Sequence, residues 1–494
     1  QTEATKFGIS KAGDWGYLGF SVDNLESIYG IPFHGEEHEE HEGEEGEEEH
    51  EEERIFSTTD SESFTIKGSL NMSGDLVNKV DFTFRDSDYI LTEAHAEEEH
   101  DEEEHEEEEH EEHEPTSFMS ASTEYGAIFD LSNDNMTQKV VFNVLDEDSS
   151  IIGEEAFMNP ATSEEFTLGY FMSKDIGMYN VDFGFRMDQI ERSGSVTDNH
   201  DGEIEMDYYN IDDTTNSFAV ALGRSLSDNL DVNLGFASVE RLPSVIELFM
   251  NGPHLATGRL EVGNPNLKSE TSNNFDVTFD YDNGDFFAYA SFYINEVDNY
   301  ITLMDEDEDH DEDHGDEDHD EDHGDDDHGD DHGDDHDDHG NLIHSFYVQE
   351  NAEFIGYELE FGRTVNLASG DLTYSFGRDQ VNAEFADGHN VPRINPARNV
   401  YSLSYEQNDT VFKINLKSVE RQNDFGEGET ATDSYRMLDT RVTKTFSVND
   451  KSKMKVTLFA NNLLDDVARN HSSFVKGPVP LPGRNVGVKF NLTF

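Results

Sequence analysis

The alternation of apolar and polar residues is the feature that most limits what this chain can fold into. Its last segment, VGVKFNLTF over 486–494, is apolar at every second position. The same period of two occurs over 64–70, 181–187, 275–281 and 412–417. Neighbouring side chains of a β-strand point to opposite faces, so these segments predict strands with one apolar face. Such strands suit a barrel that turns its apolar face to lipid and its polar face to a wet lumen.

The links between these segments alternate between short and long. Short links rich in Asn, Asp, Gly and Ser, as tight hairpins require, lie near 11–14, 73–75, 132–135, 174–177, 227–229, 282–285, 368–371, 406–410 and 447–453. Long links lie near 30–60, 93–117, 147–162, 191–206, 240–270, 303–343, 379–396, 420–433 and 463–485. The pattern predicts an all-β, transmembrane, antiparallel barrel with 19 strands, short periplasmic turns and long extracellular loops. The alternative is a soluble β-sandwich or propeller with one buried face.

An odd number of strands places the two ends of a barrel wall on opposite sides of the membrane. Single-chain bacterial barrels have even counts, so we expect residues 1–494 to be an N-terminally truncated barrel. The sequence has no stretch of about 18 apolar residues that could form a transmembrane helix. It also starts at Gln1 without a basic, apolar leader, so we expect either that processing has removed the start or that the sequence is a fragment.

Three tracts, 34–54, 95–114 and 305–340, carry much of the formal charge of −82. They hold 50 of the 113 acidic residues and 17 of the 22 histidines. Counting strands back from Phe494 places all three tracts on the extracellular side. We expect them to be disordered loops. An excess of acid of this size would repel nucleic acid, so no nucleic-acid partner is expected.

The sequence lacks the residues and motifs that several classes of metal site and enzyme require. There is no cysteine, which excludes thiolate zinc sites and disulfides. The sequence also lacks the G-x-S-x-G, H-E-x-x-H and phosphate-loop motifs. We therefore expect no catalytic residues, no catalytic cofactor and no enzyme activity.

Three motifs together resemble TonB-dependent outer-membrane receptors. The first is RLPSVIELF over 241–249, followed by EVGNPNL over 261–267. The second is ANNLLD over 460–465, which resembles the ending of the penultimate strand in that family. The third is the final strand ending at Phe494, which looks like the signal read by the barrel-insertion machinery.

Within this family the chain is most similar to the zinc-receptor (ZnuD-like) branch. The likeness lies in SIYGIP over 27–32, GEEAF over 153–157 and GPHLAT over 252–257. The resemblance implies a 22-strand barrel in the outer membrane, surrounded by its lipid, with a plug domain inside. It also implies coupling to the TonB-ExbB-ExbD complex through that plug, which we do not find in this chain.

Histidine nitrogen and carboxylate oxygen are typical ligands of zinc, whereas calcium and magnesium take oxygen alone. The repeated histidines therefore favour zinc as the transported ligand, with nickel, copper or cobalt as rivals. The alternative is a solvated charge run whose histidines are incidental. The candidate metal ligands in the tracts are His34, His38, His41, His50, His95, His100, His105, His110, His113, His310, His314, His319, His323, His328, His332, His336 and His339.

A more ordered site is expected in the loop after the RLPS motif. Glu247 and His254 could both reach a metal there if the loop folds into the barrel mouth. The alternative is that Glu247 only hydrogen-bonds within the loop and His254 is a surface turn residue. His344, His389 and His471 are weaker candidates in or beside outer loops.

These observations predict a TonB-dependent transporter for a divalent metal, with zinc first, whose outer loops capture the ion. A siderophore or haem receptor is the alternative within the family. A passive porin and a surface metal-buffering protein are alternatives from other classes, and an outer-membrane esterase is a remote one.

Overall fold

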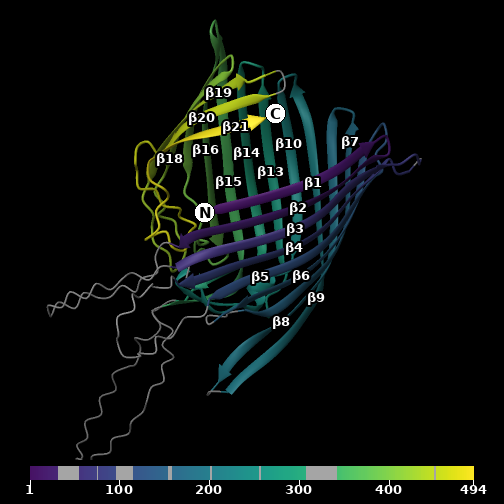
Figure 1. Ribbon diagram of the computed structural model, residues 1–494, viewed down its shortest axis with the longest axis vertical. Coiled ribbons are helices and arrows are strands. Elements are labelled where there is room, and N and C mark those ends of the chain that lie inside the picture. Colours follow the sequence, from purple (N-terminus) through teal and green to yellow (C-terminus); the bar gives the residue numbers. More distant parts are fainter. Residues whose placement is uncertain are drawn as a thin grey trace, which may run out of the picture.

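The computed structural model describes residues 1–31, 55–74, 76–95, 115–153, 158–200, 203–254, 257–306, 342–449 and 452–493. Within these ranges the chain forms one large sheet that curls into a barrel-shaped wall (Figure 1). The strands of the first half are β1 Thr2–Gly13, β2 Gly16–Ile31, β3 Ile55–Asn71, β4 Lys79–His95, β5 Thr116–Asp130, β6 Thr137–Ile152, β7 Met158–Ile176, β8 Tyr179–His200, β9 Glu203–Ser227 and β10 Leu230–Arg241.

A folded excursion separates the two halves of the wall. It contains α1 Val245–Phe249, β11 Asn251–His254 and β12 Arg259–Val262. The second half comprises β13 Glu270–Asp282, β14 Phe286–Asp305, β15 Ile343–Leu367, β16 Gly370–Phe385, β17 Arg398–Gln407, β18 Thr410–Val419, β19 Tyr435–Ser447, β20 Lys453–Asn461 and β21 Asn485–Thr493. Among the described residues, no helix is long and apolar enough to cross a bilayer.

Of the 21 strands in the described ranges, nineteen build the wall in chain order, each antiparallel to the next. β10 pairs directly with β13, so the short β11–β12 hairpin lies outside the wall order. The predicted all-β barrel with 19 strands is confirmed. In Figure 1 the short turns lie along the upper and right-hand edge of the wall, and the described parts of the long links lie along its lower and left-hand edge. We call this second edge the rim.

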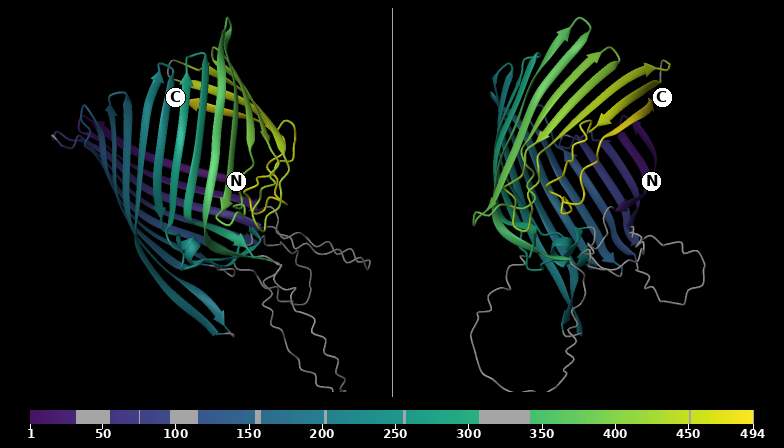
Figure 2. Two further views of the ribbon diagram at one scale, coloured as in Figure 1. Left: turned by 180° about the vertical axis from the view of Figure 1, so that it is seen from behind. Right: turned by 90° about the vertical axis from the view of Figure 1, so that its left-hand side faces the viewer.

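One predicted long link is wrong. Residues 191–206 are expected to be a loop, but β8 continues to His200 and β9 begins at Glu203. The two strands stay in register from Tyr179↔Arg224 to His200↔Glu203, so the hairpin projects well beyond its neighbours (Figure 2). The sequence over 191–206 lacks clear alternation because this part of the hairpin stands beyond the lipid and has no apolar face to maintain.

The two faces of the wall differ as the alternation predicts. In the β8–β9 pair, Phe183 lies opposite Val220 and Phe185 opposite Phe218 on the outer face. The side chains of Phe185, Val220 and Phe218 are 38%, 40% and 43% exposed, although all are apolar. Contiguous exposed apolar surface of this kind belongs in lipid, which excludes the soluble sandwich.

The sheet is open between its first and last strands. Among the described residues, β1 pairs only with β2, and β21 pairs only with β20. Every residue of β1 is exposed. Both edge strands lie at the front of Figure 1.

The largest apolar cluster lies at the rim and fixes the excursion to the wall. Leu248 and Phe249 of α1 are 0% and 1% exposed and pack with Ile151, Met158 and Ile301 from the surrounding strands. A Cβ atom at Gly194 of β8 would lie 2.5 Å from the Phe249 ring, so only glycine fits beside it. The cluster makes the excursion a rigid part of the rim.

Candidate functional site

The rim is where the three acidic, histidine-rich tracts join the wall. The first tract connects β2 to β3, the second connects β4 to β5, and the third connects β14 to β15. The tracts lie outside the described residues, except for Asp305, Glu306 and the backbone of His95. Their attachment points nevertheless lie on the same end of the wall, as the strand count predicts.

Glu247 stabilises the start of α1. Its carboxylate accepts hydrogen bonds from Arg241 NH1 at 2.9 Å and NH2 at 3.1 Å. It also accepts the backbone N–H of Ser244 at 2.7 Å, while Ser244 Oγ accepts the N–H of Glu247. This reciprocal arrangement is a capping box, and Arg241 further binds Glu270. Oε2 of Glu247 thus accepts two hydrogen bonds and Oε1 accepts one, and all three hold the loop together.

His254 has a different setting, at the end of the β11–β12 hairpin. Its Nδ1 lies 2.9 Å from Oε1 of Glu261, whose side chain is only 5% exposed. Thr257 Oγ1 donates to the same Glu261 oxygen at 3.0 Å. A carboxylate that accepts Nδ1–H fixes the tautomer and the orientation of the imidazole, as carboxylates do behind histidine ligands at zinc sites.

Glu261 and Glu93 are residues near His254 that the sequence analysis misses. Glu93, near the end of β4, lies close enough to interact electrostatically with His254. The phenyl ring of Phe118 lies 6.2 Å from the imidazole. Among the described residues, however, no three His, Asp or Glu side chains converge to hold a metal. The structure therefore places Glu247 and His254 in separate hydrogen-bonded groups.

The three weaker histidine candidates differ in burial. His344 lies 4.0 Å from Glu306 and His389 lies 2.8 Å from Asp387, and both side chains are more than half exposed. His471 is fully buried, with Nδ1 3.0 Å from Thr432 Oγ1 and Nε2 3.6 Å from Glu429 Oε2. Its ring lies inside the loop packing, between Thr432 and Glu429.

A second group of residues, the rim network, combines charged side chains with one aromatic ring and links Asp305, at the end of β14, to the surrounding loops. It consists of Arg259, Asp305, Arg393, Glu429, His471, Phe474 and Lys476. Its first half is an ion pair in which Arg259 Nε and NH2 donate to the two oxygens of Asp305 at 2.8 and 2.7 Å. Both side chains are less than a tenth exposed. Asp305, the first residue of the third tract, is thus a buried part of the folded rim.

Phe474 joins the two halves of the rim network. The guanidinium carbon atoms of Arg259 and Arg393 each lie 4.4 Å from the centre of its ring. Arg393 also donates to the Thr302 hydroxyl at 3.1 Å and to the carbonyl of Leu303. Cation–π contacts that exclude water are stronger than exposed ones, so Phe474 is expected to hold both arginines in place.

Glu429 anchors the second half of the rim network. Its carboxylate accepts the backbone N–H groups of Arg393 at 2.9 Å and Gly426 at 3.1 Å, and the Lys476 ammonium at 3.3 Å. Burial is the largest single influence and by itself would raise the pKa of this carboxyl. His471, the two N–H groups and Lys476 together outweigh burial and lower the pKa of Glu429 to about 2.

A comparison with protein families identifies the wall. The family described as TonB dependent receptor-like, beta-barrel matches residues 48–463. The chain belongs to this family. Its members are transporters of the bacterial outer membrane, and their transport is coupled to TonB. The wall of this TonB-dependent receptor therefore lies in the outer membrane, with its rim on the extracellular side.

Solved structures of the same fold share little sequence with this receptor. The copper transporter OprC superposes with a TM-score of 0.68 at 14% identity, over 100% of this chain and 79% of that chain. The FrpB iron transporter from Neisseria meningitidis (F3-3 variant) superposes with a TM-score of 0.64 at 13% identity, over 100% and 71%. The Serratia marcescens hemophore receptor HasR gives a TM-score of 0.63 at 11% identity, over 100% and 71%. At these identities the likeness shows the fold alone.

Proposed function

We propose that this receptor takes up a divalent metal ion, with zinc as the first candidate, across the outer membrane. The observation that carries the proposal is that all three histidine-containing acidic tracts attach at the extracellular rim. There they would raise the local concentration of cations above the barrel mouth, both by their charge and by many weak ligands. Capture through histidine would weaken as the pH falls through about 6.5, where imidazole gains a proton.

His254 is the ordered ligand that we propose to receive the ion from the tracts. The buried Glu261 behind it would fix the tautomer and the orientation of the imidazole, which raises metal affinity. Glu93 would add a carboxylate from the neighbouring β4. The remaining ligands would come from the tracts or from water, because the described residues hold no complete site.

Removing the third tract tests the capture role. The deletion should span 307–340, because Asp305 is needed by Arg259 and the N–H of Glu306 donates to the carbonyl of His344. With 8 of the 17 tract histidines removed, the initial rate of radioactive zinc uptake at scarce zinc should fall by about half, since capture scales with local ligand number. At plentiful zinc the rates should be equal.

A matched variant separates ligation from charge. Replacing only the eight histidines of this tract with asparagine keeps its 23 acidic residues. The proposal expects this variant to lose as much zinc uptake at scarce zinc as the deletion does. Parental uptake by the asparagine variant would refute ligation by histidine, and equal growth of deletion and parent under chelation would refute capture altogether.

A further inference from the structure

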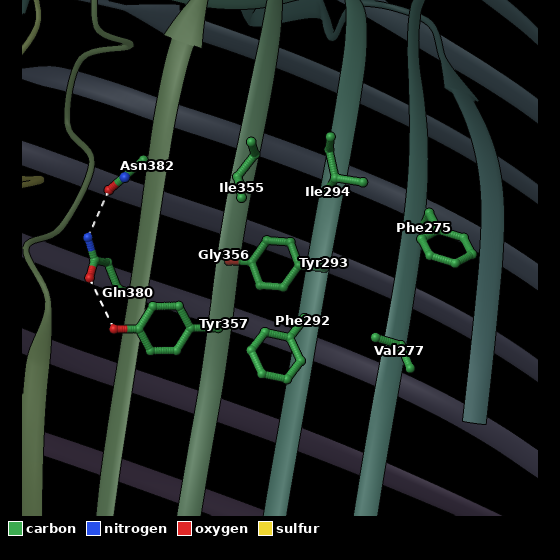
Figure 3. A pocket seen from close by; sticks show the side chains of 10 residues that line it. All are labelled: Phe275, Val277, Phe292, Tyr293, Ile294, Ile355, Gly356, Tyr357, Gln380 and Asn382. Carbon is green, nitrogen blue, oxygen red and sulfur yellow. Dashed lines mark hydrogen bonds between the residues drawn. The ribbon is translucent and has the colours of Figure 1, made fainter. Parts of the chain in front are cut away.

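The outer face of β13–β16 carries a hollow of about 420 Å³ that the proposed transport does not use. Its apolar floor is formed by Phe275, Val277, Phe292, Ile294 and Ile355, and Figure 3 shows these side chains projecting from three adjacent strands. The volume lies within the roughly 300–1,000 Å³ range of small-molecule sites. The hollow is therefore large enough to hold part of a ligand.

Strand register places the hollow on the lipid side of the wall. Phe275 pairs with Ile294, which pairs with Ile355, so the three side chains share one face. This face is exposed, since Phe275 is 49% exposed and Ile355 is 51% exposed. The opposite face of β15 points inward, where Phe354 packs against the cluster that contains Phe385 and Val391. The ligand would therefore approach from the membrane.

One side of the hollow is bordered by hydrogen-bonded polar groups, drawn in Figure 3. The Tyr357 hydroxyl lies 3.1 Å from Gln380 Oε1, and Gln380 Nε2 donates to Asn382 Oδ1 at 3.2 Å. Arg378 Nε donates to the Tyr357 hydroxyl at 2.8 Å and the same guanidinium pairs with Glu420. The positive charge of Arg378 is thus already balanced.

The polar border on β16 lies beside apolar residues of β15 at the same distance from the rim. On β15 the outward residues remain apolar up to Ile355, but on β16 the apolar run ends at Phe376 and Arg378 follows. Asn382 lies directly opposite Ile355 in the register. The edge of the lipid-facing belt on the side of the extracellular rim therefore lies farther from the rim on β16 than on β15.

We propose that this hollow binds one acyl chain of lipopolysaccharide, the glycolipid of the outer leaflet. The apolar floor would hold the chain, and the amides of Gln380 and Asn382 would hydrogen-bond the amide and hydroxyl groups where chains join the glucosamine. Because Glu420 already balances the charge of Arg378, the polar border is neutral. A neutral border suits these amide and hydroxyl groups better than it suits a phosphate. The site lies at the level of the outer leaflet, which phospholipids of the inner leaflet do not reach.

Native mass spectrometry of the delipidated receptor tests this site, with lipid A carrying two inner-core sugars as the probe. Val277→Trp fills the hollow from a lipid-facing position, so we expect apparent affinity for the glycolipid to fall about tenfold. Val144→Trp is the matched control, since Val144 is also apolar, outward-facing and 42% exposed, but lies on β6. The control should bind like the parent.

The double variant Gln380→Leu with Asn382→Leu tests the polar border without filling the hollow. It should bind phosphatidylethanolamine as well as the parent does, and lose its preference for the glycolipid. Heat-modifiable migration on gels verifies that each variant folds. Equal glycolipid binding by Val277→Trp and Val144→Trp would overturn the proposal, as would a parent that prefers phosphatidylethanolamine.

Discussion

Replacing Arg259 with methionine is expected to release the base of the third tract from the rim. The substitution leaves the Asp305 carboxylate, 9% exposed, without its bidentate partner. Removing one member of a buried ion pair costs about 3–5 kcal/mol, because the remaining charge is not solvated. Arg259 also contacts Phe474 and donates to the Thr257 carbonyl at 2.8 Å, so loops distant in sequence should loosen together.

Amide hydrogen exchange followed by mass spectrometry measures this release. Peptides covering 257–262, 302–306 and 343–346 should exchange faster in Arg259→Met, while peptides from β17 and β18 should not change. Arg398→Met is the matched control, because Arg398 binds Asp379 at 2.7 Å but is 55% exposed, and such pairs contribute only about 0–1 kcal/mol. Unchanged exchange at 302–306 in Arg259→Met would contradict the role assigned to this ion pair.

Replacing Glu429 with glutamine is expected to remove an acid-sensitive contribution to the loop packing. The folded-state pKa of about 2 lies below the reference value of 4.5. Ionised Glu429 therefore stabilises the folded loops above about pH 4.5, and this stabilisation is lost as the pH falls toward 2. The difference corresponds to about 3 kcal/mol, and the side chain is only 9% exposed, so solvent screening is small.

The measurement is local opening of residues 420–434 and 463–484, by hydrogen exchange corrected for pH. In the parent, the free energy of opening should fall by about 3 kcal/mol between pH 5 and pH 2. Glu429→Gln should start lower at pH 5 and show a smaller fall. Asp433→Asn is the control from the same loop, because Asp433 is 90% exposed. Parallel curves for the parent and Glu429→Gln would contradict the assigned role.

The wall could be predicted from the sequence because its signals are local. Alternation gives the two faces, and turn residues such as Asn283 and Gly284 give the short links between strands. The sequence does not predict the outer part of the β8–β9 hairpin, over 191–206, because alternation is no longer required beyond the lipid. Side-chain alternation also cannot show that β10 pairs with β13 across an excursion, which depends on the packing of Leu248 and Phe249.

The rim contacts could not be predicted for a different reason. Arg259 and Asp305 are 46 positions apart, and Arg393 and Glu429 are 36 apart, so their meeting depends on how long loops fold over one another. A local signal did exist for Glu247, since Ser244 three residues earlier forms the S-x-x-E pattern of a capping box. Glu261 carried no comparable signal, because its contact with His254 needs the β11–β12 hairpin.

Energised zinc accumulation is the most direct test of the central claim. Cells that lack other zinc receptors and produce this receptor would be supplied with scarce radioactive zinc, with and without a proton-motive-force uncoupler. The account predicts accumulation above empty-vector cells, its loss with the uncoupler, and a clear reduction in His254→Asn but not in His389→Asn, whose imidazole is 71% exposed. Accumulation no greater than in empty-vector cells, while a ferric siderophore or haem is taken up, would contradict it.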